Sequence, residues 1–156
     1  MTIVHLTGID PGLVHTGVVK LQLNNLERTI NVTSVVVLGP DAAAVKSVVG
    51  QAPNVFVEKY EDRGTSFSTH GEMRAFERDL TAAIPRAQLL SNTGVKKVVT
   101  ETMLDVIVGK LPTTNHQDLE SAARIALYGG LKIPEINSVL YHLAIDHLAG
   151  RSWARS

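Results

Sequence analysis

Residues 2–38 hold three apolar runs of strand length joined by short polar turns, and this pattern constrains the fold most. The runs are TIVHLTGID, TGVVKLQL and TINVTSVVVL, at residues 2–10, 16–23 and 29–38. Connections this short join antiparallel neighbours, because a parallel crossover needs about a dozen residues or more. The sequence therefore predicts an antiparallel meander of three strands, with Pro11 and Gly12 turning the chain after the first.

After the meander, helical and strand patterns alternate. A helix is expected at 40–52 with Pro40 at its start, a short apolar strand at 54–60, a helix at 70–84 that Pro85 ends, and a strand at 87–92. Three further helices are expected: part of 95–111, 118–128 with Gly129 and Gly130 as its stop, and 133–150. We therefore expect an α/β domain over residues 1–156, built on a five-stranded mixed sheet.

Composition excludes several classes of protein. The chain has 156 residues, 44% of them hydrophobic, which suits one packed domain. It has no cysteine, which excludes a disulfide scaffold, a cysteine-ligated zinc site and a cysteine nucleophile. The start MTIVHLTGID lacks the basic and apolar regions of a signal peptide, and no apolar run reaches membrane-spanning length. We therefore expect a cytoplasmic protein without a membrane partner.

The charge balance limits how the chain could bind nucleic acid. It has 15 basic and 15 acidic residues, so the net charge is zero. A protein that holds nucleic acid by bulk charge is usually basic. If nucleic acid is the partner, the basic residues must therefore gather on one face.

Carboxylates stand at the edges of three separate apolar elements. Asp10 ends the first expected strand, Glu58 follows the run NVFV, and Asp118 and Glu120 open an alanine-rich helix. If the first and fourth strands are neighbours, their carboxylates can meet. Clustered acids repel one another, and a hard divalent cation bound by oxygen ligands, Mg²⁺ or Mn²⁺, resolves the conflict. Two such ions roughly 4 Å apart can activate water against a phosphodiester.

Each acid also has an ordinary structural explanation. Asp-Pro-Gly is a common hairpin turn, and Glu58 could be a surface acid beside Lys59. Asp118 could cap its helix, and Glu120 could favour the positive end of the helix dipole. Taken singly these explanations suffice, whereas a metal site explains the acids together.

The stretch GIDPGLVHTGVV, residues 8–19, resembles the first strand and turn of RuvC-type Holliday junction resolvases, members of the ribonuclease H-like superfamily. VFVEKY resembles the family strand that ends in a catalytic glutamate, here Glu58. LLSNTGVKKVV places Val95 and Lys96 on a valine-lysine pair, and DLESAARIAL resembles the closing acid-bearing helix. The order of elements agrees from about residue 3 to residue 128. The resemblance implies a ribonuclease H-like fold, with helices on both faces of the sheet.

The same resemblance implies an activity and its residues. It implies a crossover junction endodeoxyribonuclease that resolves branched DNA by paired nicks, using two Mg²⁺ or Mn²⁺ ions per site. The metal ligands would be Asp10, Glu58, Asp118 and Glu120, and Lys96 would stabilise charge on the phosphate. The short chain is reminiscent of phage-encoded members, which would place it in the host cytoplasm.

The acid-bearing helix departs from the family pattern. Aligning the alanines puts Asp118 on the first acidic position but the neutral Ser121 on the second. Either Glu120 reaches in, or a shifted register uses His116 with Glu120, or the site has only three acids. We favour Asp118 with Glu120. The stretch before this helix is short, so Lys110 is only a positional candidate for a second family lysine.

The segment after Glu58 is expected to lie near the junction. Tyr60 and Phe67 could stack on bases, which contributes about 1–3 kcal/mol per base; core packing or a loop position are the alternatives. Four basic residues are candidates for phosphate contacts, with a solvated surface as the alternative: Lys59, Arg63, Lys96 and Lys97.

The helix at 70–84 carries an apolar stripe, Met73, Phe76, Leu80 and Ile84. Core packing explains this stripe fully. The resemblance implies in addition that the helix forms a homodimer, which would place two metal sites on opposed strands of a four-way junction.

Other functions remain open from the sequence. A YqgF-like ribonuclease acting on structured RNA shares the fold and the first aspartate. A RuvC-like fold that binds branched DNA without cutting it is kept open by Ser121. An actin-like kinase also has Asp-x-Gly after a strand, but it needs two lobes and 156 residues are too few.

Overall fold

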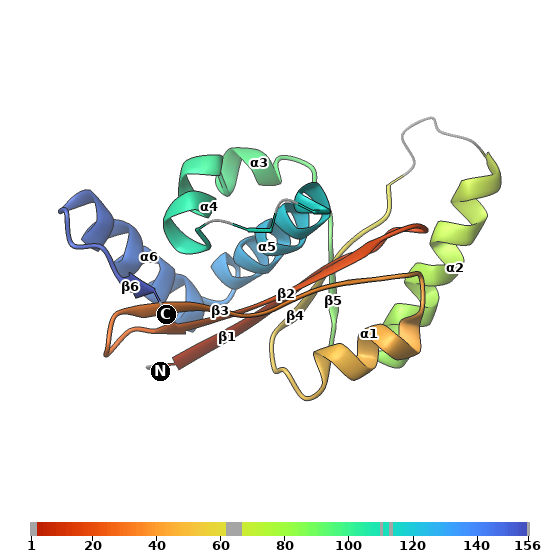
Figure 1. The fold of residues 1–156 in the computed structure, drawn as a ribbon, viewed down its shortest axis with the longest axis horizontal. Coiled ribbons are helices and arrows are strands. Elements are labelled where there is room, and N and C mark those ends of the chain that lie inside the picture. Colours follow the sequence, from red (N-terminus) through yellow and green to blue (C-terminus); the bar gives the residue numbers. More distant parts are fainter. Residues whose placement is uncertain (1–2, 62–66, 110, 113, 156) are drawn as a thin grey trace.

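The structure of the protein is a computed structural model, in which residues 3–61, 67–109, 111–112 and 114–155 are described. One mixed sheet crosses the molecule in the order β5-β4-β1-β2-β3-β6 (Figure 1). The strands are β1 (Ile3–Asp10), β2 (Thr16–Asn24), β3 (Thr29–Leu38), β4 (Val55–Glu58), β5 (Gln88–Leu90) and β6 (Ala154–Arg155). The expected meander is confirmed, since β1 pairs antiparallel with β2 and β2 with β3.

The later strands extend the sheet on both sides. β4 pairs parallel with β1, and β5 pairs parallel with β4, as a mixed sheet requires. The five expected strands are all present. β6 is an addition that the sequence did not predict: its two residues pair with the start of β3. Its position depends on contacts made by the C-terminal segment rather than on a strand pattern.

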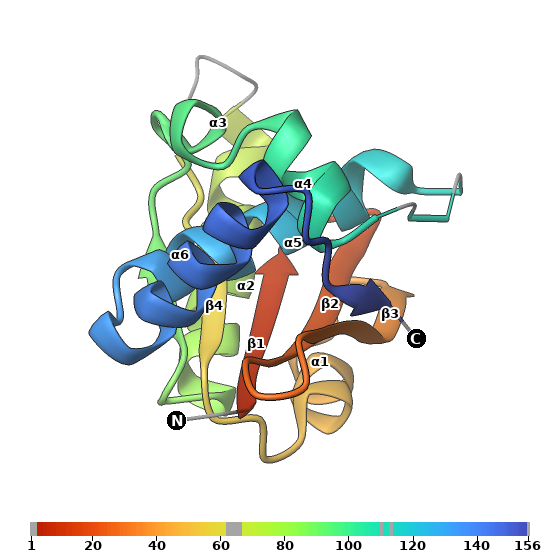
Figure 2. The ribbon, with the colours of Figure 1, turned by 90° about the vertical axis from the view of Figure 1, so that its left-hand side faces the viewer.

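Helices cover both faces of the sheet, as expected. They are α1 (Ala42–Val49), α2 (Phe67–Ala83), α3 (Val95–Val98), α4 (Glu101–Ile107), α5 (His116–Leu131) and α6 (Pro134–Leu148). Figures 1 and 2 show α1 and α2 on one face and α3 to α6 on the other. In the described part of the chain, no helix is both long and apolar enough to cross a bilayer.

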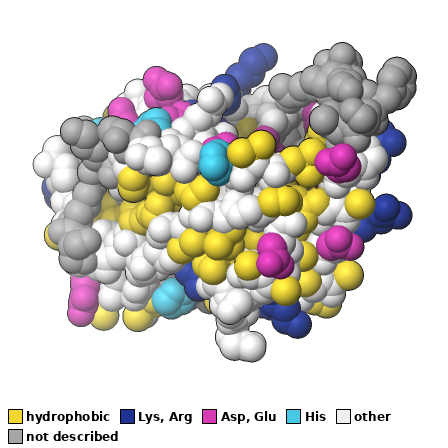
Figure 3. Space-filling model, turned by 45° about the vertical axis from the view of Figure 1, so that its right-hand side comes forward, with side chains coloured by type: hydrophobic (Ala, Val, Ile, Leu, Met, Phe, Trp, Pro, Cys, Tyr) yellow, Lys and Arg dark blue, Asp and Glu magenta, His cyan; other side chains and the backbone are white. Residues whose placement is uncertain are grey.

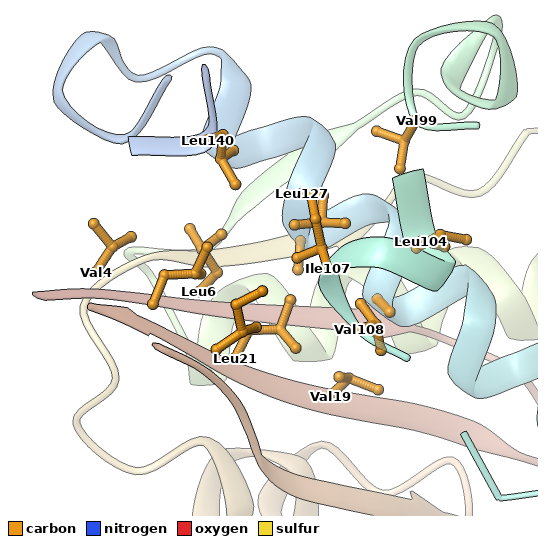
Figure 4. Close-up of a cluster of buried hydrophobic side chains, with 14 of the residues drawn as sticks. Val4, Leu6, Val19, Leu21, Val99, Leu104, Ile107, Val108, Leu127 and Leu140 are labelled. Carbon is orange, nitrogen blue, oxygen red and sulfur yellow. The ribbon is translucent and has the colours of Figure 1, made fainter. Parts of the chain in front are cut away.

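Each face of the sheet has its own hydrophobic core. On the α5 side, Leu6 and Leu21 of the sheet point toward Leu127 of α5 and Ile107 of α4 (Figure 4). On the other side, Phe76 and its neighbours in α2 pack with α1 against β4. The alternation of apolar side chains along β1 and β2 supplies both cores, which fixes the register of the strands.

The expectation that Gly129 and Gly130 end their helix is wrong, because α5 continues through both to Leu131. Both glycines are buried against the sheet. A Cβ atom on Gly129 would lie 2.3 Å from the ring of Phe56, and one on Gly130 would lie 3.0 Å from Leu6. These glycines therefore serve close helix–sheet packing.

The expected helix at 95–111 is divided into α3 and α4. Thr100 caps α4 by accepting a hydrogen bond from the Met103 backbone N–H at 3.2 Å. The backbone bend at Val99 and Thr100 gives α3 its own direction. As a result, the Lys96 segment is positioned separately from the helix that follows.

A buried aspartate fastens the C-terminal segment. Asp146 of α6 accepts a hydrogen bond from the indole Nε1 of Trp153 at 2.9 Å. Arg28 and Arg151 each approach its carboxylate to 3.4 Å. The Trp153 hydrogen bond, followed by the charges of Arg28 and Arg151, lowers the pKa of Asp146 despite some desolvation. This cluster joins α6, the β2–β3 turn and the segment that leads into β6.

We predict that Asp146→Asn lowers the melting temperature at pH 7 by a few degrees, because an amide does not pair with the two arginines. Because the carboxyl pKa is lowered on folding, its stabilisation is present above the ordinary pKa of 3.8 and is lost as the pH falls further. Circular dichroism melts at pH 7 and near pH 3 measure this. A difference between wild type and variant that does not shrink at the lower pH would contradict the ionic account.

Candidate active site

Asp10 and Glu58 lie together at one edge of the sheet. Ile9 of β1 is in register with Val57 of β4, so the next residue on each parallel strand stands at the same edge. The Asp10 and Glu58 carboxyl groups are hydrogen-bonded to each other. The Asn92 side-chain amide, just beyond β5, donates a further hydrogen bond to Glu58 Oε1.

The first turn of α5 brings Asp118 to the same edge. Gly17 of β2 is the partner of Asp10 in the β1–β2 register. A Cβ atom on Gly17 would lie 2.7 Å from the backbone oxygen of Asp118 and 3.4 Å from its Cβ. The missing side chain therefore allows Asp118 to lie directly over the strand pair that ends in Asp10.

The three acids form one electrostatic cluster. Burial, then the hydrogen bond that the protonated Asp10 carboxyl makes with Glu58, then the charges of Glu58 and Asp118, raise the pKa of Asp10 to about 9. At neutral pH, Asp10 is therefore protonated. A charge arrangement of this kind is typical of functional sites, and a divalent cation relieves it.

The donor chemistry of the cluster fits a hard cation. Asp10, Glu58 and Asp118 offer only carboxylate oxygens, the ligands that Mg²⁺ and Mn²⁺ prefer. Within the described residues, no three His, Asp or Glu side chains already stand in an arrangement that holds an ion. A cation held by all three carboxylates would require that the Asp10 proton has left.

Glu120 does not join this cluster. Its Oε1 lies 3.2 Å from Nη2 of Arg124, and its Oε2 lies 3.1 Å from Nε2 of His116. His116 and Arg124 lie one helical turn before and after Glu120, so both carboxylate oxygens of Glu120 are paired within the helix. Of the expected pair on α5, the structure brings Asp118 to Asp10 and leaves Glu120 paired along the helix. Ser121 faces a groove beside Glu58.

The candidate DNA-binding residues surround the acids. Lys96 and Lys97 are exposed on α3 and line the groove that contains Glu58. Lys59 and Tyr60 line a second hollow with Asp10. The two hollows share Glu58 and Asn92, so they lie next to each other at this edge of the sheet.

Tyr60 is held by α2. Its hydroxyl is hydrogen-bonded to Nδ1 of His70, and its backbone N–H donates to Glu77 Oε2 at 2.6 Å. The side chain is half-buried. The polar end of Tyr60 is thus engaged, and the residue is positioned at the rim of the acid cluster.

Some predicted positions fall outside the description. Arg63 and Lys110 are outside the described residues, and so is the side chain of Phe67, whose backbone begins α2. The apolar stripe of α2 packs inward, with Phe76, Leu80 and Ile84 buried in the core and Met73 at the hollow beside Asp10. Dimerisation through α2 stays a prediction.

Sequence reasoning missed two residues of the site. Asn92 follows β5 at the edge where β1 and β4 end, and a polar residue after a parallel strand was a usable signal. Arg124 is the only charge in SAARIALY, and a charge within an alanine-rich helix was a second signal. Arg124 is buried and borders the groove.

The face of the molecule drawn in Figure 3 is not a basic one. On the side drawn in Figure 3, apolar side chains fill the middle and the visible Lys and Arg side chains of the described residues stand at the margins. By contrast, Lys96, Lys97 and Arg124 border one groove. If nucleic acid is the partner, these three basic residues beside the acids are the local group that a chain without net charge would need.

We predict that Asp10→Asn stabilises the metal-free protein. The folded chain keeps the Asp10 proton up to about pH 9, whereas the unfolded chain releases it near 3.8, so wild-type stability falls as the pH rises between these values. At pH 8 the variant should melt higher, by about 2–4 °C for each kcal/mol of repulsion removed. Melts from pH 5 to pH 9 measure this. Equal melting temperatures at pH 8 would refute the strained cluster.

We predict that Gly17→Ala displaces Asp118, because the new Cβ atom meets backbone at 2.7 Å. Overpacking of this kind costs about 1–3 kcal/mol of stability. The stabilisation of the fold by added Mg²⁺ should also decrease, since one ligand is moved. The matched control is Gly39→Ala, where a Cβ atom meets nothing within 4 Å. Equal melting behaviour of the two variants, with and without Mg²⁺, would contradict this role of Gly17.

Comparison with known proteins was made by sequence and by structure. No family model and no curated protein sequence matches the chain. Thermus thermophilus RuvC in complex with a Holliday junction substrate matches with a TM-score of 0.61 and 16% identity, covering 96% of this chain and 98% of that one. A second Thermus thermophilus RuvC structure matches with a TM-score of 0.60 and 16% identity, covering 96% and 99%.

A weaker match is a Fowlpox virus resolvase in complex with Holliday junction DNA, with a TM-score of 0.46, 12% identity and coverage of 88% and 99%. The fold assignment rests on the two Thermus structures, which agree with this chain over almost its whole length. The chain has the fold of RuvC, the ribonuclease H-like fold that its GIDPG segment led us to expect.

Proposed function

We propose that this chain is a metal-dependent, structure-selective endonuclease that resolves four-way DNA junctions by paired nicks. The observation that carries the proposal is the convergence of Asp10, Glu58 and Asp118 at one sheet edge of a RuvC fold. The choice of substrate is supported by a structural neighbour that was solved with a Holliday junction.

The acids would hold the cofactor. Two Mg²⁺ or Mn²⁺ ions bound by Asp10, Glu58 and Asp118 would activate water and stabilise the leaving oxygen of the phosphodiester. Asn92 orients the Glu58 carboxylate through its hydrogen bond. Lys96, exposed on the wall of the groove beside Glu58, is placed to stabilise negative charge on the phosphate.

Paired nicks require two such clusters, and one chain supplies one. We therefore include a homodimer with two-fold symmetry in the proposal, so that each protomer acts on one of two opposed strands. The buried side of α2 is occupied by the core. A dimer formed through α2 would use the outer side, where Glu72, Arg74 and Arg78 are exposed.

The test is cleavage of a labelled synthetic four-way junction in Mg²⁺. We expect symmetric nicks from the wild type and a loss of more than about 100-fold in Asp10→Asn and Glu58→Gln, because loss of a metal ligand exceeds the usual cost of losing an outer partner. Junction binding should survive in both variants. Glu27→Gln, an exposed acid in the β2–β3 turn, is the matched control and should cut like wild type.

In the same assay, Glu120→Gln tests whether Glu120 is a fourth metal ligand. Activity within a few-fold of wild type would agree with the pairing of Glu120 to Arg124 and His116. A loss as large as that of Asp10→Asn would mean that Glu120 turns into the site when DNA is bound.

Two control substrates separate the other functions. Cleavage of an RNA hairpin without cleavage of the junction would favour the YqgF-like ribonuclease. Junction binding with no cleavage of any substrate would favour a protein that holds branched DNA. Two observations favour a protein that binds without cutting. Ser121 is neutral where the family has an acid, and Asp10 and Glu58 are hydrogen-bonded to each other.

A further inference from the structure

The groove between α3 and α5 carries positive charge next to the acid cluster. Lys96 and Lys97 stand on its α3 wall, and Arg124, Gln117 and Ser121 stand on its α5 wall. The cavity has a volume of about 530 Å³. Glu58 is the only acid among its lining residues in the described part of the chain, so the rest of the groove offers donors and cations.

Arg124 is the buried donor of this groove. Its Nε donates to the backbone oxygen of Val99 at 3.1 Å, and its Nη2 donates to Glu120 at 3.2 Å. Among the described residues, Nη1 has no acceptor, and no buried side-chain polar atom lacks a partner. Nη1 is therefore not fully buried, and Arg124 is one of the residues that line the groove.

The same contacts fix the two walls relative to each other. Val99 follows α3 directly, so the bond from Arg124 ties the helix that carries Lys96 and Lys97 to α5. Only 8% of the Arg124 side chain is exposed, so the guanidinium is held in place rather than free to rotate. A rigid, partly desolvated guanidinium beside two lysines and an amide is suited to an oxyanion with several acceptor oxygens.

We propose that this groove binds a second backbone phosphate of the strand that is cut, adjacent to the phosphodiester at the acid cluster. The inference rests on the proposed function. The groove adjoins the acid hollow, because Glu58 and Asn92 line both, and successive phosphates of one strand require such neighbouring sites. The ligand is a phosphate rather than a base, since the described residues that line the groove include charged donors but no aromatic side chain for stacking.

The test is the affinity of a fluorescein-labelled four-way DNA junction without divalent cation, measured by anisotropy at several salt concentrations. Lys97→Glu and Gln117→Glu alter exposed residues on the two walls. Each should weaken binding about tenfold, Lys97→Glu because a charge-assisted contact is lost and Gln117→Glu because a carboxylate then faces the phosphate. For Lys97→Glu the slope of log K against log salt should also decrease by about 0.9. Lys46→Glu on α1, across the sheet, is the matched control and should leave both quantities unchanged.

Arg124→Gln removes the buried charge and leaves an amide, and its fold is checked by circular dichroism. If Arg124→Gln unfolds, the Lys97→Glu and Gln117→Glu variants still test whether the groove binds DNA. Lys97→Glu and Gln117→Glu variants that bind like Lys46→Glu, while the wild type cuts junctions, would overturn the groove and leave the nuclease standing. A wild type that neither binds nor cuts junctions would refute the proposed function instead.

Uncharged methylphosphonate linkages identify the ligand directly. Replaced one at a time beside the cleaved bond, one of them should weaken wild-type binding and have little further effect on Lys97→Glu. If no flanking linkage matters, or if wild type and Lys97→Glu respond equally, the groove does not hold a phosphate.

Discussion

The close contact between α5 and the β1–β2 pair is the constraint on which the site depends. Gly8 and Gly17 leave no side chain where the helix crosses the strands; a Cβ atom on Gly8 would lie 1.8 Å from the backbone oxygen of Ala122. Gly129 makes the same approach possible from the helix side. A helix seated this low carries Asp118 to the edge where Asp10 and Glu58 end. With larger residues at these positions, the helix would stand away from the sheet and the acids would not form one cluster.

This packing brings the carboxyl groups of Asp10, Glu58 and Asp118 close together. The metal-free fold accommodates them because Asp10 keeps its proton. Burial and two neighbouring carboxylates keep Asp10 protonated near neutral pH. The hydrophobic cores on the two faces of the sheet, and the Asp146 cluster at its far end, stabilise the fold in compensation. Repulsion at the site is consistent with function, since a cation that binds the folded state stabilises it.

The strands and the acids were predictable because their signals are local. Alternating apolar residues and short turns define β1 to β3, and Asp10 and Glu58 stand at strand ends that the chain itself marks. The prediction that Gly129 and Gly130 end the helix was wrong because glycine near a helix end can serve either as a C-cap or in close packing. Only the tertiary contact with Phe56 distinguishes the two roles. The orientation of Glu120 was not predictable for the same reason: it depends on Arg124 and His116, one turn away in each direction.

The helix α5 carries a negative charge, on Asp118, and a positive charge, on Arg124, within a few residues of each other. Its first turn adds Asp118 to the acids, and further along the helix Arg124 binds Glu120 and lines the groove. The pairing with Arg124 and the neutral Ser121 both remove negative charge from the side that faces Lys96. In the proposed function, a chain with no net charge thus presents a cation-binding edge and an anion-binding groove next to each other. For a substrate whose charge is a line of phosphates, this local separation decides binding more than the total charge does.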